Sequence, residues 1–266
     1  MIHIDRGDAP SELTEDVVHS KTAAFKADPK KVVWRDKYIV EALMNMSHNK
    51  CAYCECKLGE ESKYMEVEHF HDKKDFPDEV VLWNNLLPSC KKCNTSKGDH
   101  NTVLEPIINP SVDVPQEHMI LFRGVRFRGI DDMGKKTIVV LNLNDQEHHC
   151  KVRYAIGQVI TEELEKLLED SIEFMDGTRN QTSQGLGRLR NSTAALLSKG
   201  TKDKEYSAVV ATALLSDDLY ASLKANLQQL NIWTDEMNHL EAELQTIRKR
   251  LRVYTLHNSK KAVTAD

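Results

Sequence analysis

Two pairs of cysteines, each with two residues between its members, constrain the fold of this chain more than any other feature. Cys51 and Cys54 form the first pair (CAYC), and Cys90 and Cys93 form the second (CKKC). Two such pairs can place four thiolates at the corners of a tetrahedron, which is the arrangement that a structural zinc ion requires. Six cysteines in a chain of 266 residues without a secretory pattern favour metal binding or free thiols over disulfides. We therefore expect one structural zinc site, with Cys56 and Cys150 left over as small buried residues.

Composition and charge limit the possible partners. Hydrophobic residues make up 40% of the chain and charged residues 29%, which is typical of soluble proteins. The formal net charge of -5 excludes a chain that is basic throughout, so nucleic-acid binding must come from local patches or from a partner. We see neither a signal peptide nor an apolar run long enough to cross a bilayer. We therefore expect a cytoplasmic protein without a membrane partner.

Helical periodicity occurs at both ends of the chain. The pattern predicts one helix from Glu12 to about Ala27 and a second from Val33 towards Ser47, with Asp28-Pro29 between them. From about Val152 the chain is predicted to be helical to its end, and the polar stretch 178–187 is predicted to be a loop or a break.

The last predicted helix carries a heptad pattern. Its apolar residues alternate steps of four and three: Trp233, Met237, Leu240, Leu244, Ile247, Leu251 and Tyr254. Packing on the same chain and a coiled-coil contact with a second chain both explain this pattern. The basic residues on the last two turns (Arg248, Lys249, Arg250 and Arg252) suit a helix C-terminus, and a phosphate contact is an alternative.

Short strands are predicted between these helical regions. The segments 119–127 and 137–143 alternate or run apolar, and Gly124, Gly129 and Gly134 separate them.

The second cysteine pair lies at the start of a predicted short helix from Cys90 to Lys97. Ser89 is a good N-cap residue, and Gly98 suits the position after the helix. Cys90, Cys93, Asn94 and Lys97 then share one helix face. Zinc and packing would have to stabilise so short a helix.

At this point a family resemblance is evident. The segments CAYCE, EVEHF, LWNNLLPSC and KKCNTSKGD occur in the order of the HNH endonuclease motif in its zinc-stapled ββα-metal form. This resemblance covers residues 51 to about 100. The flanking segments PIINPSVD (Pro106–Asp113) and TIVVLNLND (Thr137–Asp145) resemble the HNH subunit of Septu-type anti-phage systems.

The resemblance implies a fold class and four segments. It implies an α+β chain in which a zinc-stapled ββα-metal core is embedded in a mainly α-helical chain with a few short strands. Residues 1–48 would form an N-terminal helical segment, and residues 49–110 the HNH core with its zinc site. Residues 111–150 would form a short-strand segment packed on that core. Residues 151–266 would form a helical region that binds a partner.

The resemblance also implies site residues. His69 occupies the position of the general base, and an imidazole suits this task because it titrates near neutral pH. Glu68 and Asn94 occupy the two metal-binding positions, and their oxygen atoms suit Mg²⁺ or Mn²⁺. Most family members have aspartate in place of Glu68, and many have histidine in place of Asn94. Neighbours on a strand point to opposite faces, so Glu68 and His69 can share a site only near a strand end or a bulge.

The expected roles of three more residues in this region are as follows. Asn85 matches the middle position of the motif, which implies that it holds the loop that orients His69, and Asn84 beside it is the alternative. Lys97 could contact the scissile phosphate as a point charge or could be a solvated lysine. The motif assigns no role to His71, which we interpret as polar surface.

The implied function is a single-metal nuclease that acts on DNA or RNA. It would use one catalytic Mg²⁺ or Mn²⁺ ion and one structural Zn²⁺ ion. The implied partners are an ABC/SMC-like ATPase subunit and, in retron-associated members, a reverse transcriptase with its templated DNA. The alternatives are a zinc-stabilised nucleic-acid-binding or adaptor module without catalysis and a zinc deaminase. The deaminase motifs H-x-E and P-C-x-x-C do not match, because Glu68 precedes His69 and Ser89 separates Pro88 from Cys90.

Overall fold

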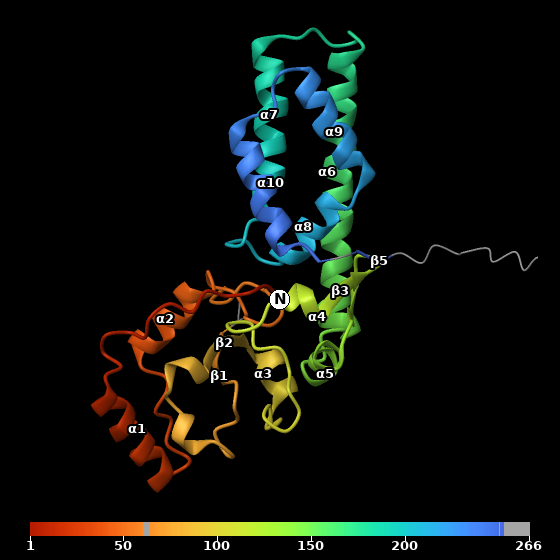
Figure 1. The fold of residues 1–266 in the computed structure, drawn as a ribbon. Helices are drawn as coiled ribbons and strands as arrows, with labels where there is room; N and C mark the ends of the chain where they lie inside the picture. Colours follow the sequence, from red (N-terminus) through yellow and green to blue (C-terminus); the bar gives the residue numbers. More distant parts are fainter. Residues whose placement is uncertain (61–63, 250, 253–266) are drawn as a thin grey trace, which may run out of the picture.

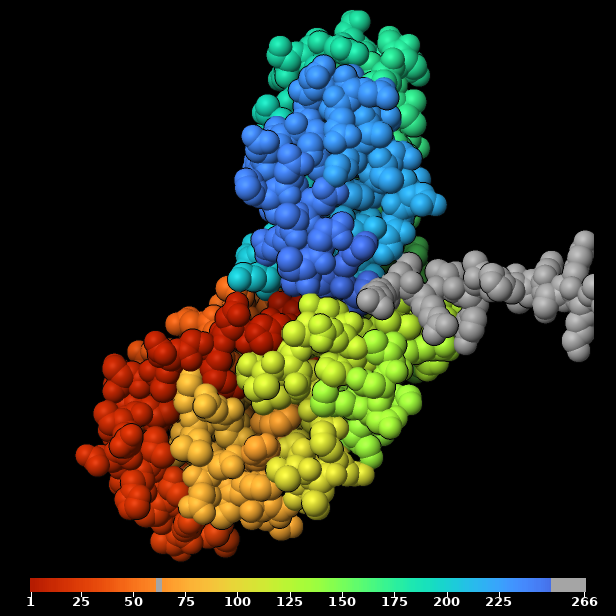
Figure 2. All heavy atoms as spheres, viewed as in Figure 1, coloured from red at the N-terminus to blue at the C-terminus, as the bar shows by residue number. Residues whose placement is uncertain are grey.

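The structure is a computed structural model that describes residues 1–60, 64–249 and 251–252. The chain forms two parts (Figure 1). The wider part holds the short strands and the N-terminal helices, and the narrower part is a column of helices from the C-terminal half. Figure 2 shows that the two parts are packed end to end. Helices together with a few short strands confirm the predicted α+β class.

An antiparallel strand pair followed by a helix lies at the centre of the wider part. Strand β1 (Met65–His69) pairs with β2 (Leu86–Cys90), with Met65 opposite Cys90 and His69 opposite Leu86. Residues 70–85 connect the strands and include the 3-10 helices η1 (Pro77–Glu79) and η2 (Trp83–Asn85). Helix α3 (Lys91–Lys97) follows β2 without a break and packs on both strands.

The N-terminal helices cover one side of this unit. Helix α1 (Glu15–Ala27) begins after the N-cap Thr14, and α2 (Lys37–Met46) begins after Asp36. The prediction that the second helix starts near Val33 is therefore wrong, because Trp34 and its neighbours precede the first helical turn. The buried side chains Ile39 and Leu43 attach α2 to the strand pair.

A second sheet contains strands in the order β4-β3-β5. The short helix α4 (Pro115–His118) leads into β3 (Met119–Phe122), which forms an antiparallel hairpin with β4 (Arg126–Gly129). The two-residue strand β5 (Leu251–Arg252) pairs with β3 in parallel. The hairpin confirms the strands predicted within residues 119–127.

The predicted strand over residues 137–143 is wrong, because most of this segment belongs to helix α5 (Asp132–Val140). The side chain of Asp131 caps the helix by accepting a hydrogen bond from the backbone N–H of Gly134. The buried Thr137 donates its hydroxyl to Met133 O and accepts from the backbone N–H of Ile108. These contacts outweigh the strand propensity of the β-branched run.

The C-terminal helices form the narrower part. The π-turn η3 (Gln146–Cys150) leads into α6 (Lys151–Met175), a long helix that confirms the periodicity seen from Val152. Four helices pack along it or on one another: α7 (Ser183–Ser198), α8 (Ser207–Leu215), α9 (Asp218–Gln229) and α10 (Asp235–Ile247).

The heptad pattern ends earlier than predicted. Helix α10 stops at Ile247, Arg248 is extended and Arg252 lies in β5, so these two basic residues do not lie on further helical turns. Met237 and Leu244 are fully buried against α7 and α8 of the same chain. This seam is therefore an intramolecular contact. Arg250 and Tyr254 lie outside the described residues.

The core joins segments that are distant in the sequence. One hydrophobic cluster contains Met1 and Ile4 of the N-terminal arm, the cysteine region, β3 and Val209 of α8. Within the described ranges, no helix is long and apolar enough to cross a membrane.

Candidate functional site

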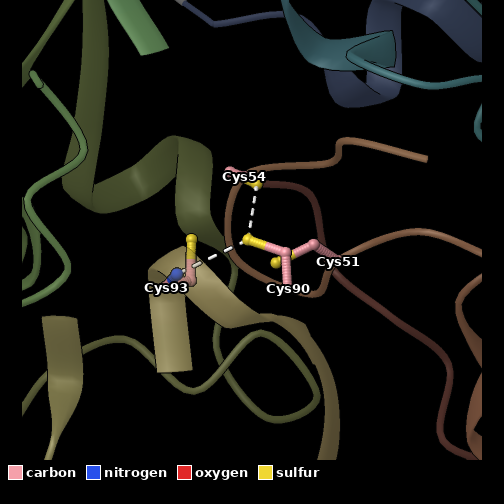
Figure 3. A group of neighbouring side chains, drawn as sticks. All are labelled: Cys51, Cys54, Cys90 and Cys93. Carbon is pink, nitrogen blue, oxygen red and sulfur yellow. Dashed lines mark hydrogen bonds between the residues drawn. The ribbon is translucent and has the colours of Figure 1, made fainter. Parts of the chain in front are cut away.

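The four cysteines of the two pairs meet in one buried cluster (Figure 3). Their Sγ atoms all lie within 4.8 Å of one another, and those of Cys54 and Cys90 are 3.8 Å apart. Four sulfurs held tetrahedrally at about 2.3 Å from a zinc ion lie about 3.8 Å from one another. All four are free thiols, and the structure shows no other potential metal-binding group of this kind in the part of the chain that it describes. The geometry fits a structural zinc ion, as the spacing predicted.

The thiols need a cation if all four are to ionise. A hydrogen bond with Cys51 is the main cause that raises the pKa of Cys93, and burial raises it further. A central cation would stabilise the thiolate forms, which burial and the neighbouring thiols disfavour.

Cys90 also starts helix α3. It is the last residue of β2 and the N-cap of the helix, and its Sγ accepts a hydrogen bond from the backbone N–H of Cys93 at 3.4 Å. The predicted N-cap, Ser89, lies inside β2 instead. Gly98 ends the helix with a φ of 55°, as predicted for the residue after it. The cysteine cluster therefore sets the position of α3 and of the side chains that α3 carries.

His69 is the last residue of β1 and is 5% exposed. Its Nε2 lies 2.9 Å from the carbonyl oxygen of Val80. A carbonyl only accepts hydrogen bonds, so Nε2 carries the ring proton and Nδ1 keeps its lone pair. Burial lowers the pKa of His69 to about 4, so the imidazole is neutral at pH 7. A neutral ring with a fixed tautomer can accept a proton at Nδ1.

Trp34 also contacts the His69 ring. The two rings meet edge to face, with centroids 4.8 Å apart and planes at 89°. The ammonium of Lys73 lies 5.5 Å from the centroid of the indole ring of Trp34. The sequence pattern placed Trp34 within the second predicted helix, which starts at Val33. No signal in the sequence indicated the contact with His69, because the two residues are 35 positions apart.

Glu68 and Lys97 form a buried ion pair next to His69. Lys97 Nζ lies 2.7 Å from Glu68 Oε1 and donates a hydrogen bond to the carbonyl oxygen of His69 at 2.8 Å. Glu68 is 2% exposed and Lys97 3%. Burial raises the pKa of Glu68 to about 7, and the charge of Lys97 opposes this rise. Lys97 is thus no solvated lysine, and a contact with phosphate would require it to leave Glu68.

The fit of these residues to a catalytic cation rests on two observations. Glu68 Oε1 is buried and makes no hydrogen bond of good geometry, although Lys97 is close to it. Asn94 is half-buried on α3, one turn before Lys97, and its side chain makes no hydrogen bond to the described residues. Both oxygen donors therefore have free coordination capacity, as Mg²⁺ or Mn²⁺ would need.

Asn85 joins the two ends of the loop between β1 and β2. Its Oδ1 accepts from the backbone N–H of His71 at 2.7 Å, and its Nδ2 donates to the carbonyl oxygens of His71 at 3.0 Å and Glu79 at 3.2 Å. Glu79 directly precedes Val80, which holds the ring of His69. Asn85 is buried, whereas Asn84 is exposed.

His71 points to Glu79 rather than to the other candidate ligands. Its Nδ1 lies 2.7 Å from Glu79 Oε2, and both side chains are about one-third exposed, at 33% and 31%. The structure thus brings Glu68, the backbone of His69 and Lys97 together and leaves His71 in a separate contact with Glu79.

Comparison with known proteins gives two relatives with the same printed name. The chain is 41% identical over 258 residues to the Septu protein PtuB of Bacillus thuringiensis, covering 97% of this chain and 98% of that protein. It is 28% identical over 181 residues to the Septu protein PtuB of Bacillus mycoides (strain KBAB4), covering 54% of this chain and 57% of that protein. No family model matches the chain.

Proposed function

Because this chain belongs to the family of Septu PtuB proteins, we propose that it is the nuclease subunit of a multi-protein anti-phage defence system. The proposed reaction is HNH-type hydrolysis of nucleic-acid phosphodiesters. The state of His69 carries this proposal: Nε2 donates to Val80 O, the ring is neutral, and Nδ1 is left as the proton acceptor. The order of β1, the connecting loop, β2 and α3 supports it, since the motif positions His69, Asn85 and Asn94 fall on β1, the loop and α3.

His69 acts first in the proposed mechanism. Its Nδ1 accepts a proton from the attacking water, and the bond from Nε2–H to Val80 O stabilises the positive charge that the ring then carries. Trp34 restricts rotation of the ring through its edge contact. A base that is neutral and held in one orientation is ready for each turnover.

Glu68 and Asn94 are the proposed ligands of one divalent cation. Mg²⁺ or Mn²⁺ at these residues would supply positive charge to the transition state and to the departing 3′ oxygen. The charge of Lys97 favours the ionised form of Glu68 and opposes the burial that raises its pKa to about 7. The expected products carry a 5′-phosphate and a 3′-hydroxyl. Asn85 holds the loop that places Val80, and zinc at the four cysteines has only a structural role.

Partner subunits complete the proposal. The net charge of -5 predicts weak binding of nucleic acid by the chain alone. We therefore propose that an ABC/SMC-like ATPase subunit provides most of the substrate binding. In a retron-linked system, the reverse transcriptase with its templated DNA would contribute to it. Low activity of the isolated chain suits a defence nuclease in an uninfected cell.

His69→Ala tests the proposed chemistry. Cleavage with Mn²⁺ or Mg²⁺, measured on the purified chain and on its complex with the ATPase subunit, should fall by about 10²- to 10⁴-fold, because a positioned general base contributes that much. The matched control is His71→Ala, which should keep most of the activity because His71 contacts Glu79 and not His69. A His69→Ala protein that cleaves as well as the unmodified chain would falsify the proposal.

A further inference from the structure

Lys73 brings a positive charge next to His69. Its ammonium lies 5.5 Å from the centroid of the Trp34 ring, and the same ring meets the His69 ring at a centroid distance of 4.8 Å. Lys73 is half-buried, so part of its side chain reaches solvent. Trp34 therefore connects the ammonium of Lys73 to the proposed general base.

The backbone around Lys73 is held in a turn. The carboxylate of the buried Asp72 accepts a hydrogen bond from the backbone N–H of Lys74 at 3.0 Å. The carbonyl oxygen of Asp72 accepts from the backbone N–H of Phe76 at 2.8 Å. The residue before Asp72 is bonded in turn to Asn85. Lys73 thus extends from a fixed backbone, and packing on the indole ring restricts its long side chain further.

The charge of Lys73 acts on both neighbouring site residues. Burial is the main cause that lowers the pKa of His69, and the charge of Lys73 lowers it further. Burial raises the pKa of Glu68, and the charges of Lys97 and then Lys73 oppose this rise. Charges separated by a long distance would have little effect of this kind. The ammonium is therefore close to the place where the proposed chemistry occurs.

Lys73 differs from other lysines of this region in its partners. Three of them lie within ion-pair distance of a carboxylate: Lys74 with Asp99, Lys92 with Asp145, and Lys97 with Glu68. Lys73 forms no ion pair with any residue that the structure describes. Its ammonium can therefore bind an anion without first leaving a carboxylate.

The position of Lys97 gives this difference its meaning. The sequence motif left a contact with the scissile phosphate open for Lys97. Its Nζ instead lies 2.7 Å from Glu68 Oε1 and donates to the carbonyl oxygen of His69 at 2.8 Å. Binding phosphate through Lys97 would break a buried ion pair, which is costly. Lys73 can supply the same positive charge without that loss.

From these observations we propose that Lys73 binds a non-bridging oxygen of the substrate phosphate that water attacks beside His69. This inference rests on the proposed nuclease function and names the lysine that contacts phosphate there. An ammonium donates charge-assisted hydrogen bonds to phosphate oxygens, and it stabilises the negative charge that grows on them in the transition state. Such a contact positions the nucleic acid without reading its bases.

The first test is a binding measurement that does not depend on cleavage. The full chain carries His69→Gln, which removes the proposed base and keeps a side chain of similar length. It is titrated against short fluorescein-labelled single-stranded DNA, duplex DNA and RNA, and fluorescence anisotropy is followed at several salt concentrations. Adding K73M should weaken binding by about three- to tenfold at low salt. The slope of log K against log[salt] should become shallower by about 0.7 for a single strand and about 0.9 for duplex DNA, because one phosphate contact is lost.

Three substitutions separate charge from packing. Lys73→Met removes the charge but keeps an unbranched side chain that can pack on the Trp34 ring, so the melting temperature should not change. Lys73→Arg keeps the charge and should restore most of the binding. Lys74→Met is the matched control, because Lys74 is the next residue and its side chain is 78% exposed. It should leave affinity and salt dependence unchanged.

The second test is cleavage by chains in which His69 is intact. K73M should cleave about 10²-fold more slowly than K74M, because a donor to the developing negative charge is lost. Equal cleavage by these two chains would overturn the inference and leave the nuclease proposal intact.

Two binding results would also overturn the inference. One is equal affinity and equal salt slope of the K73M and K74M chains for all three probes, and the other is a His69→Gln chain that binds none of them at low salt. Because the binding chains all carry His69→Gln, failure of the nuclease proposal leaves the binding result unaffected.

Discussion

At the scale of the single residue, the chemistry available to His69 follows from its two neighbours. Val80 O determines which nitrogen carries the proton, and Trp34 packs edge to face against the ring. Burial then keeps the ring neutral down to a pH of about 4. A solvent-exposed histidine would be partly protonated near neutral pH and would exchange between tautomers. The environment therefore turns an ordinary imidazole into a proton acceptor of defined geometry.

Asn85 gives a residue-scale prediction. Asn85→Ala removes three hydrogen bonds and leaves buried backbone groups of His71 and Glu79 without partners. We expect the free energy of unfolding to fall by about 1–3 kcal/mol, as measured by urea denaturation. We also expect cleavage to slow by about 10- to 100-fold, because Val80 and hence His69 lose their position.

The neighbouring residue is the matched control for this prediction. Asn84 is exposed, so Asn84→Ala should change the free energy of unfolding by no more than about 0.5 kcal/mol. Equal effects of the two substitutions on stability and cleavage would show that Asn85 does not hold the loop.

The cysteine cluster was the most predictable part of the site, and the surroundings of His69 were the least. The spacing of Cys51, Cys54, Cys90 and Cys93 has few alternative explanations, and the structure brings the four together. The contact of Trp34 with His69 and the position of Lys97 on Glu68 depend on tertiary packing, which has no periodic signature in the sequence. The contacts of Asn85 agree with the loop-holding interpretation, whereas its catalytic consequence stays a prediction.

At the scale of the element, helix α3 depends on the cysteines at its start. It has only 7 residues, which is too short for independent stability in water. Cys90 caps it, and Cys93 ties its first turn to the cluster. The helix in turn delivers Lys97 to Glu68 and to the backbone of His69. Loss of the metal should therefore disturb the ion pair as well as the cluster.

Cys93→Ser tests this dependence at the scale of the element. We expect the zinc content, measured by inductively coupled plasma mass spectrometry, to fall from about one ion per chain towards zero, because one thiolate ligand is lost. We expect the melting temperature to fall with it, since metal binding contributes to folding.

Cys150→Ser is the matched control for this substitution. Cys150 is equally buried, but its Sγ contacts the carbonyl oxygen of Asn144 at 3.4 Å rather than the cluster. The control protein should therefore keep its zinc. A Cys93→Ser protein with full zinc content would contradict the four-cysteine assignment.

The elements that were predicted wrongly share a physical cause. The segment 137–143 contains a β-branched run, but the Asp131 cap and the contacts of Thr137 select a helix. The heptad pattern of α10 continues past its end, but the chain becomes extended at Arg248 and β5 pairs with β3. In both places a contact with a distant segment overrides a local propensity.

At the scale of the whole molecule, one buried carboxylate joins the two parts of the chain. Glu55 Oε2 lies 2.6 Å from the amino group of Met1, and Glu55 Oε1 accepts from Ser207 Oγ at 2.7 Å and from the backbone N–H of Ala208 at 3.3 Å. Burial opposes ionisation of this group, but the amino group of Met1 and the ammonium of Lys50 together lower the pKa of Glu55 to about 2. The carboxylate thus stays charged and also accepts hydrogen bonds at the start of α8.

Glu55→Ala tests this junction. The substitution leaves buried cationic groups and the start of α8 without their acceptor. We expect the free energy of unfolding to fall by about 3–5 kcal/mol, which is typical when one partner of a buried ion pair is removed. Chemical denaturation followed by far-ultraviolet circular dichroism measures the change.

Glu60→Ala is the control at this scale, because the Glu60 side chain is 65% exposed. It should shift the free energy of unfolding by no more than about 0.5 kcal/mol. Equal stability of the two variants would show that the junction does not depend on Glu55.

Glu55 directly follows Cys54, so loss of the proposed zinc ion would also affect the position of Glu55 and the stability of the chain. In a chain that has not acquired zinc at the proposed site, the backbone next to Glu55 would lose its tie to the cluster, and the anchor of the helical part would weaken. Such a chain would open as a unit and become a substrate for cellular proteases. An incomplete copy of the proposed nuclease would then not persist in a folded form that occupies the proposed partner subunits. Only copies that hold zinc would then remain available for the proposed assembly with partner subunits.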